Sequence, residues 1–143
     1  MPTDAAASFL IGREIGTYVI TLLIFFAIDL VWLGVVAKNF YRQHIGHLLA
    51  AEVNWGAAVL FYLMFIGGLV FFAVKPALEA GSATRALGYG ALFGLLTYAT
   101  YDLTNQATMR DWPVLVTVVD LAWGTVLSAT VAYLSYQVSS RAL

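Results

Sequence analysis

Three aspartates stand in stretches that are otherwise almost free of charge: Asp29, Asp102 and Asp120. A carboxyl group inside a membrane-spanning segment is costly to bury, so it marks a functional site by default and requires a partner. Such groups can exchange protons, act together as general acid and base, or bind the polar part of a ligand. The alternative is structural: each Asp only joins neighbouring helices through hydrogen bonds to Trp, Tyr, Thr or Asn.

Two of the three aspartates lie in residues 97–124, and the first of them has polar neighbours at helical spacing. Tyr98, Asp102 and Asn105 fall at positions i, i+4 and i+7, so in a helix they share one face. Tyr101 occupies the adjacent face. The pattern predicts a helix that presents hydroxyl, carboxyl and amide groups together.

A second pattern places a tryptophan three residues after an aspartate, in Asp29-x-x-Trp32 and again in Asp120-x-x-Trp123. An internal duplication does not explain the match, because the two segments are expected to run in opposite directions. The local interpretation is that each Trp flanks its own Asp and donates its indole N–H to it. Convergent packing explains the pattern as well as a shared function does.

Metal and cofactor motifs are weak in this chain. His44-x-x-His47 and Glu52 could supply metal ligands together with an Asp, but the spacing is unspecific and interfacial histidines are commoner than metal sites. The sequence contains no cysteine, no Ser/His/Asp arrangement, no phosphate-binding glycine loop and no dinucleotide fingerprint at a convincing position. We predict neither a metal nor a cofactor.

The composition identifies the setting of these residues. Of 143 residues 62% are hydrophobic and 10% are charged, whereas about a quarter are charged in soluble domains. The mean hydropathy is +0.85. A net charge of −1 without a basic cluster excludes nucleic acid as a partner. The chain is expected to be an integral membrane protein whose partner is membrane lipid.

The apolar runs predict one all-α membrane domain over residues 1–143, a bundle of four transmembrane helices at about 17–37, 55–74, 86–106 and 113–137. Residues 1–16 are expected to be a tail, and the first span is kept because it is too long for a signal peptide. Lys75-Pro76 is expected to end the second span. Residues 38–54 suit a short interfacial helix between the first two spans.

Helix direction predicts where the acids lie. Four spans place both termini on one side, and at 1.5 Å per residue Asp29, Asp120 and Asp102 lie about 13, 10 and 6 Å below the opposite face. All three therefore fall in one half of the membrane, and the count of Lys and Arg narrowly favours cytoplasmic termini. The predicted catalytic residues are Asp29, Asp102 and Asp120, and the predicted substrate-binding residues are Asn54, Tyr98, Tyr101, Asn105, Trp32 and Trp123.

Gly90-x-x-x-Gly94 allows a second helix to approach closely. That helix can belong to the same chain or to another copy, so a homodimer through this motif is one expectation. Packing within the monomer is the other.

Several short motifs together resemble a known family: Asp29-Leu-x-Trp32-Leu-Gly34, Phe40-Tyr41-Arg42, Gly46-His47, Asn54-Trp55, Tyr98-Ala-Thr-Tyr101-Asp102-Leu-Thr-Asn105, Asp111-Trp112-Pro113 and Asp120-Leu-Ala-Trp123-Gly124. They resemble the bacterial membrane proteins called domain of unknown function 2177. The resemblance covers nearly the whole chain. It implies a small multi-pass protein of the bacterial inner membrane, with no established family activity.

Three functions are compatible with these residues. The preferred hypothesis is an Asp-lined site that binds or modifies a lipid or lipid-like amphipathic molecule, with Asp102 and Asp120 as general acid and base and the two asparagines orienting the polar head. The first alternative is a small proton-coupled transporter or channel acting as a dimer, with Asp29 and Asp120 carrying the proton. The second is an accessory subunit that only packs against a larger membrane complex.

Overall fold

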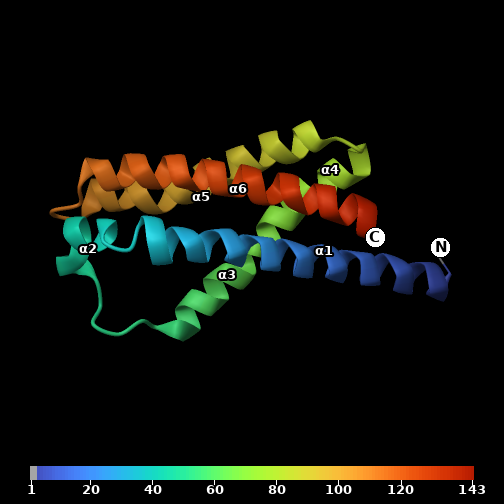
Figure 1. Ribbon diagram of the computed structural model, residues 1–143, viewed down its shortest axis with the longest axis horizontal. Coiled ribbons are helices and arrows are strands. Elements are labelled where there is room, and N and C mark those ends of the chain that lie inside the picture. The colour runs from blue at the N-terminus through green and yellow to red at the C-terminus, as the bar shows by residue number, and fades with distance from the viewer. Residues whose placement is uncertain (1–2) are drawn as a thin grey trace.

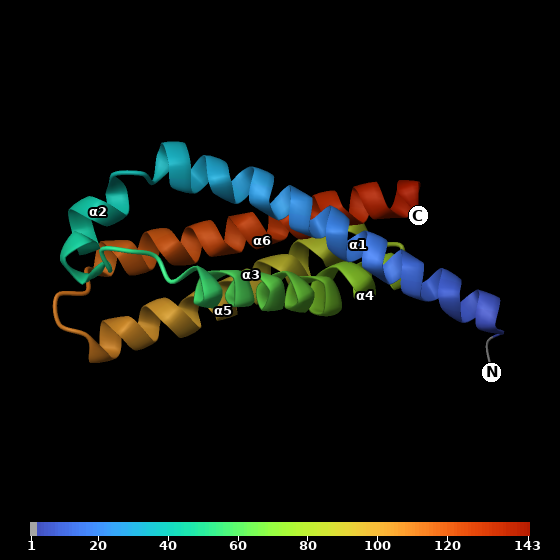
Figure 2. The same cartoon turned by 90° about the horizontal axis from the view of Figure 1, so that it is seen from below.

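Helices make up nearly all of the protein. The computed structural model describes residues 3–143, in which no residue belongs to a strand. Long helical stretches run back and forth between two ends of an elongated bundle, and both termini lie at the same end (Figures 1 and 2). The all-α prediction is confirmed.

The first stretch consists of α1 (Asp4–Val31) and the π-helical turn η1 (Trp32–Val36). The Thr3 side chain accepts a hydrogen bond of 3.3 Å from the Ala6 backbone N–H and so caps the helix. The prediction of a tail up to residue 16 is therefore wrong, because small residues behind a good cap continue the helix outward.

The second stretch consists of α3 (Trp55–Leu69), the π-helical turn η3 (Val70–Val74) and α4 (Lys75–Ala80). Lys75-Pro76 does not end it, contrary to the prediction, because Pro76 lies in the first turn of α4, where its missing N–H costs little. The helix ends instead at Gly81, whose φ of 61° is a left-handed conformation that glycine adopts without strain.

Between these two stretches lie α2 (Phe40–Ile45) and a 3₁₀ turn, η2 (Gly46–Leu48). A short helix is thus present in the segment that was predicted to hold one. Ile45 is buried against Trp112 and Val116, which belong to the start of the last helix and the turn before it. This contact folds α2 over one end of the bundle.

The last two helices, α5 (Ala83–Thr108) and α6 (Val114–Ala142), form the most extensive contact in the molecule. Glycines make this possible: a Cβ on Gly90 would stand 2.7 Å from the Ser128 carbonyl oxygen and one on Gly94 would stand 2.5 Å from Ser128 Oγ. Of the two expectations for the glycine motif, the structure shows packing within the monomer. The surface proposed for a homodimer is occupied by α6.

The hydrophobic core lies in the middle of the bundle and extends toward the end that holds the termini. Phe25, Ile66, Leu69 and Leu127 are almost fully buried there, where α1, α3, η3 and α6 meet. The other end is more open. Residues 55–64 of α3 diverge from the remaining helices, and Trp55 at their start is 70% exposed (Figure 1).

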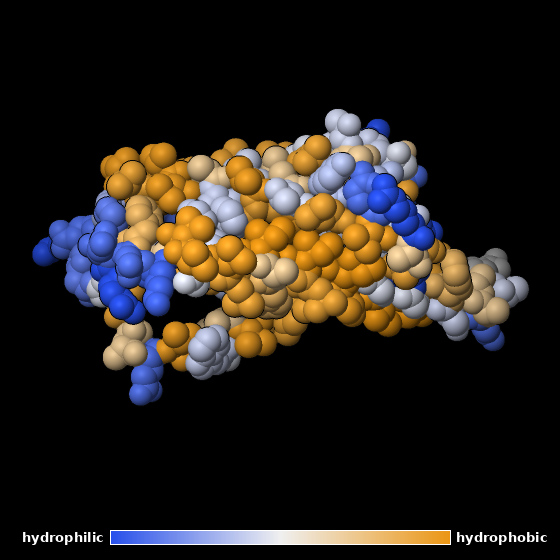
Figure 3. Space-filling model, in the orientation of Figure 1, coloured by the Kyte–Doolittle hydropathy of each residue, from blue (hydrophilic) through white to orange (hydrophobic). Residues whose placement is uncertain are grey.

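Within residues 3–143, three helical stretches are long and apolar enough to cross a membrane: Asp4–Val36, Trp55–Ala80 and Val114–Ala142. Figure 3 shows a broad hydrophobic surface between the hydrophilic end around α2 and further hydrophilic residues toward the other end. α5 is not among the three, because Thr, Tyr, Asp, Asn and Gln fill its second half. The membrane prediction is supported, with three candidate spans rather than the four predicted.

Candidate functional site

The open end of the bundle contains an open cavity of about 470 Å³, lined by residues of α1, η1, α2, α3, α5 and α6 and of the turns beside them. Two carboxyl groups and many aromatic rings line it. The lining residues are Asp29, Trp32, Leu33, Tyr41, Ile45, Leu49, Phe61, Tyr62, Tyr98, Tyr101, Trp112, Asp120 and Trp123.

A chain of hydrogen bonds crosses this cavity from α6 to η1. The Tyr41 hydroxyl donates to Asp120 Oδ1 over 2.6 Å, and Trp32 Nε1 donates to the Tyr41 oxygen over 3.3 Å. Burial, and then the hydrogen bond to Asp120, raise the pKa of Tyr41 well above its usual range. The phenol therefore stays protonated and can keep donating to Asp120.

The two tryptophans of the Asp-x-x-Trp pattern stack on each other. The ring centroids of Trp32 and Trp123 are 4.2 Å apart and their planes differ by 8°. Trp123 lies beside Asp29, and Trp32 bonds to the Tyr41 that holds Asp120. Because α1 and α6 are antiparallel, Trp123 of α6 lies near Asp29 of α1, and Trp32 contacts the tyrosine that is bound to Asp120 of α6. The prediction that each Trp pairs with its own Asp is wrong.

Asp102 lies on the face of α5 that packs against α6 and is 0% exposed. The carboxyl of Asp120 is near enough to interact with it, and neither oxygen of Asp102 has a hydrogen-bond partner among residues 3–143. A hydrogen bond between two carboxyls requires one proton. The arrangement therefore suits a shared proton, which would give Asp102 the partner that it lacks.

Tyr98 stands among the three acids, close enough to interact electrostatically with each of them. Its ring packs directly on Gly124, where a Cβ would come within 2.7 Å of Tyr98 Cδ2. Only a glycine at position 124 leaves room for the Tyr98 ring. The sequence alone does not show this role, because it depends on how α5 packs against α6.

The remaining predicted binding residues are more scattered. Tyr101 lines the cavity, with its ring edge-on to Trp112 at 5.7 Å, and Asn105 lies beside Tyr101 one turn further along α5 without lining the cavity. Asn54 is exposed, and its side chain accepts a hydrogen bond of 3.1 Å from the Ala57 N–H. The structure thus corrects the predicted position of Asn54, because its amide caps α3 and does not line the cavity.

Several residues of the cavity were not predicted as site residues. They include Tyr41, Phe61 and Tyr62, and Tyr62 lies beside Asp29. One signal was available for Tyr62, since its phenol is the one ionisable side chain between Trp55 and Val74. No local pattern identifies Tyr41, whose role depends on how α2 folds back.

Two further hollows adjoin the cavity. One of about 340 Å³ opens between α3 and α5 and is lined by Phe61, Thr97, Tyr98, Tyr101 and Asp120, so it shares most of its lining with the cavity. The other, also about 340 Å³, lies along α1 and η1 and reaches the Trp32–Trp123 stack. Of the three acids, Asp120 thus also borders the hollow between α3 and α5.

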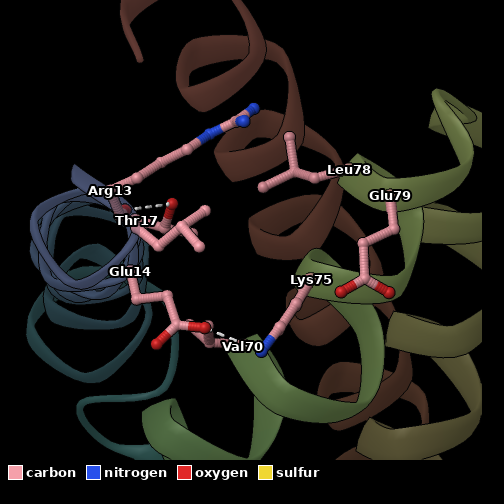
Figure 4. A pocket seen from close by; sticks show the side chains of 8 residues that line it. Arg13, Glu14, Thr17, Val70, Lys75, Leu78 and Glu79 are labelled. Atoms are coloured by element: carbon pink, nitrogen blue, oxygen red, sulfur yellow. Dashed lines mark hydrogen bonds and ion pairs between the residues drawn. The ribbon is translucent and has the colours of Figure 1, made fainter. Parts of the chain in front are cut away.

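A separate hollow of about 160 Å³ lies near the termini, between α1 and α4 (Figure 4). Lys75 Nζ and Glu14 Oε1 form an ion pair of 2.7 Å at its edge, with Arg13 and Glu79 on its other sides. Both paired side chains are about half exposed, so the pair contributes little to stability. No three His, Asp or Glu side chains within residues 3–143 are grouped as metal ligands.

Comparison with known proteins places the chain in a family. No curated protein and no solved structure matches it. One family model matches residues 15–137, that of domain of unknown function 2177, described as a predicted membrane protein. The match includes every residue that lines the cavity holding Asp29 and Asp120, which we call the Asp cavity. The chain therefore belongs to the domain of unknown function 2177 family of membrane proteins.

Proposed function

We propose that the protein crosses the bacterial inner membrane four times, with α5 as the fourth span. α5 has 26 residues, enough for the hydrocarbon core, and its polar Asp102 is covered by α6. α2 then lies at one membrane surface and both termini at the other, with cytoplasmic termini favoured by the Lys and Arg count.

We further propose that the Asp cavity binds, and acts on, a lipid or lipid-like amphipathic molecule. One observation carries this proposal: the cavity holding Asp29 and Asp120 continues into the hollow between α3 and α5, which is lined almost entirely by apolar atoms. A molecule with a polar head and an apolar tail matches this succession of surfaces. Its head meets the carboxyls while its tail lies between the helices, in contact with lipid.

The acids allow general acid and base chemistry on such a head group. Asp102 and Asp120 can pass one proton between them, and the Tyr41 hydroxyl fixes the orientation of Asp120. Asp29 faces them from α1 across the cavity and is placed to bind the head group. Asn54 has no part in this proposal because its amide caps α3.

The lipid composition of a strain lacking the gene tests the proposal. We expect one lipid class to change in amount, the wild-type gene to restore it, and Asp102→Asn and Asp120→Asn to fail to do so although the variants reach the membrane at normal levels. Asp111→Asn is the matched control, because Asp111 is exposed in the turn before α6 and its φ of 60° suits Asn as well as Asp. Identical lipids in all strains would contradict the proposal.

Proton-coupled transport remains the second candidate, since a carboxyl pair that can hold one proton is also what a proton carrier needs. Its dimer through Gly90 and Gly94 is not supported, because α6 of the same chain covers both. Substrate-dependent pH changes in proteoliposomes that disappear in Asp120→Asn would favour transport over modification.

A further inference from the structure

The cavity is lined by acidic side chains and by no basic side chain. Asp29 and Asp120 line it, Asp102 lies directly behind Asp120, and no Lys, Arg or His is among the lining residues. Among residues 3–143, the one ion pair joins Lys75 to Glu14, and it lies at the opposite end of the bundle, near the termini. Charge balance in the cavity therefore has to come from protons or from a bound cation.

Asp29 is positioned to meet such a cation. It is 6% exposed and its carboxyl faces the cavity. Trp123 and Tyr62 flank it without forming a hydrogen bond of good geometry, and Trp123 Nε1 is left without an acceptor. A carboxylate that is buried and only loosely held gains most from a positively charged ligand.

Aromatic rings surround the same space. The faces of Trp, Tyr and Phe attract organic cations, and several such rings around an acid form the type of cage that binds ammonium groups. Here the stacked Trp32–Trp123 pair provides one wall, and the hydroxyl of Tyr41 is already engaged with Asp120. The other rings lining the cavity are Phe61, Tyr62, Tyr98, Tyr101 and Trp112.

We propose that the ligand carries one positive charge, as an amine or a quaternary ammonium group, on an apolar tail. This inference rests on the proposed function and names the chemical class of its ligand. The charged head lies between Asp29 and Asp120, and the tail leaves past Phe61 between α3 and α5. Mg²⁺ or Ca²⁺ fits this space poorly, because these ions require about six oxygen ligands and aromatic rings supply none.

Three amphiphiles with the same tail test the charge of the ligand: octyltrimethylammonium, octyl glucoside and octyl sulfate. Binding to the protein in nanodiscs of neutral lipid is followed by tryptophan fluorescence, since three of the four tryptophans line the cavity, and empty nanodiscs correct for partitioning. We expect the cation to bind at least about tenfold more tightly than the other two. Asp29→Asn and Asp120→Asn should remove this preference and Asp111→Asn should retain it.

The three ligands separate this inference from the function on which it rests. Saturable binding of all three with equal affinity to wild-type protein would overturn the cationic ligand while supporting an amphiphile site. Tighter binding of octyl sulfate would overturn it as well. Saturable binding of none would overturn both. The three ligands are compared on wild-type protein, so the result does not depend on whether an Asp→Asn variant folds.

Discussion

The Tyr41 hydroxyl donates a hydrogen bond of 2.6 Å to Asp120, which lies 79 residues away in the sequence. This bond joins α2 to α6 and so covers one end of the Asp cavity. Trp32 Nε1 extends the chain to η1. The connection between the first two long helices thus forms part of the site.

Replacing Tyr41 by Phe should reveal this bond through its pH dependence. We expect Tyr41→Phe to lower the free energy of unfolding in detergent by about 1–2 kcal/mol at neutral pH. The raised pKa of Tyr41 means that the folded protein retains the phenolic proton at a pH where the unfolded chain loses it, so this stabilisation declines as pH rises above about 10. The difference between wild type and variant should therefore shrink between pH 9 and 11. A difference that stays constant over this range would contradict the assignment.

Close packing of α5 on α6 predicts a sharp contrast between two neighbouring glycines. Gly90→Ala should destabilise the protein by about 1–3 kcal/mol, because its Cβ would overlap Ser128 and Ala132 on α6. A Cβ on Gly88 meets nothing within 4 Å, so Gly88→Ala should leave stability unchanged or slightly raised. Thermal unfolding in detergent measures both. Equal effects would mean that the two helices pack less closely than described.

Because the start of α3 diverges from the other helices, we expect the passage between α3 and α5 to open and close. Spin labels on cysteines placed at Leu60 and Thr100, both exposed, should give a broad distance distribution between α3 and α5, which narrows when the cationic amphiphile binds. Labels at Phe71 and Leu92, in the closed half, are the control and should give one narrow distance. The native chain has no cysteine that would interfere. Equally narrow distances in both pairs would rule out a mobile α3.

The fourth span can be tested with single cysteines at the two ends of α5. If α5 crosses the bilayer, a membrane-impermeant maleimide should label Thr84→Cys and Thr108→Cys from opposite sides. Cytoplasmic termini place Thr84 on the cytoplasmic side. Labelling of both positions from one side would show that α5 does not span.

Local composition was enough to predict a helical membrane protein and to single out the three acids as candidates. Long apolar runs fix the helix positions, and a lone carboxyl within such a run is conspicuous in any arrangement. Close approach of another helix at Gly90 and Gly94 was also predicted, although the sequence did not say whether that helix belongs to the same chain. These features depend on short stretches of chain.

The pairings within the site could not be predicted, because they depend on how distant segments meet. Whether Trp123 approaches Asp120 or Asp29 follows from the antiparallel contact of α1 with α6. Asn54 is a different case. An Asn directly before an apolar run is a typical helix N-cap, and interpreting it as a ligand-binding residue overlooked that local signal.

The polar second half of α5 has a consequence for how the protein is made. With α5 as the proposed fourth span, Asp102 is shielded from lipid by α6, which follows α5 in the chain. The two helices would then enter the membrane together, as a hairpin closed by the turn at residues 109–113. A chain stopped before residue 114 would lack the helix that covers Asp102, and α5 would then be expected to stay at the membrane surface.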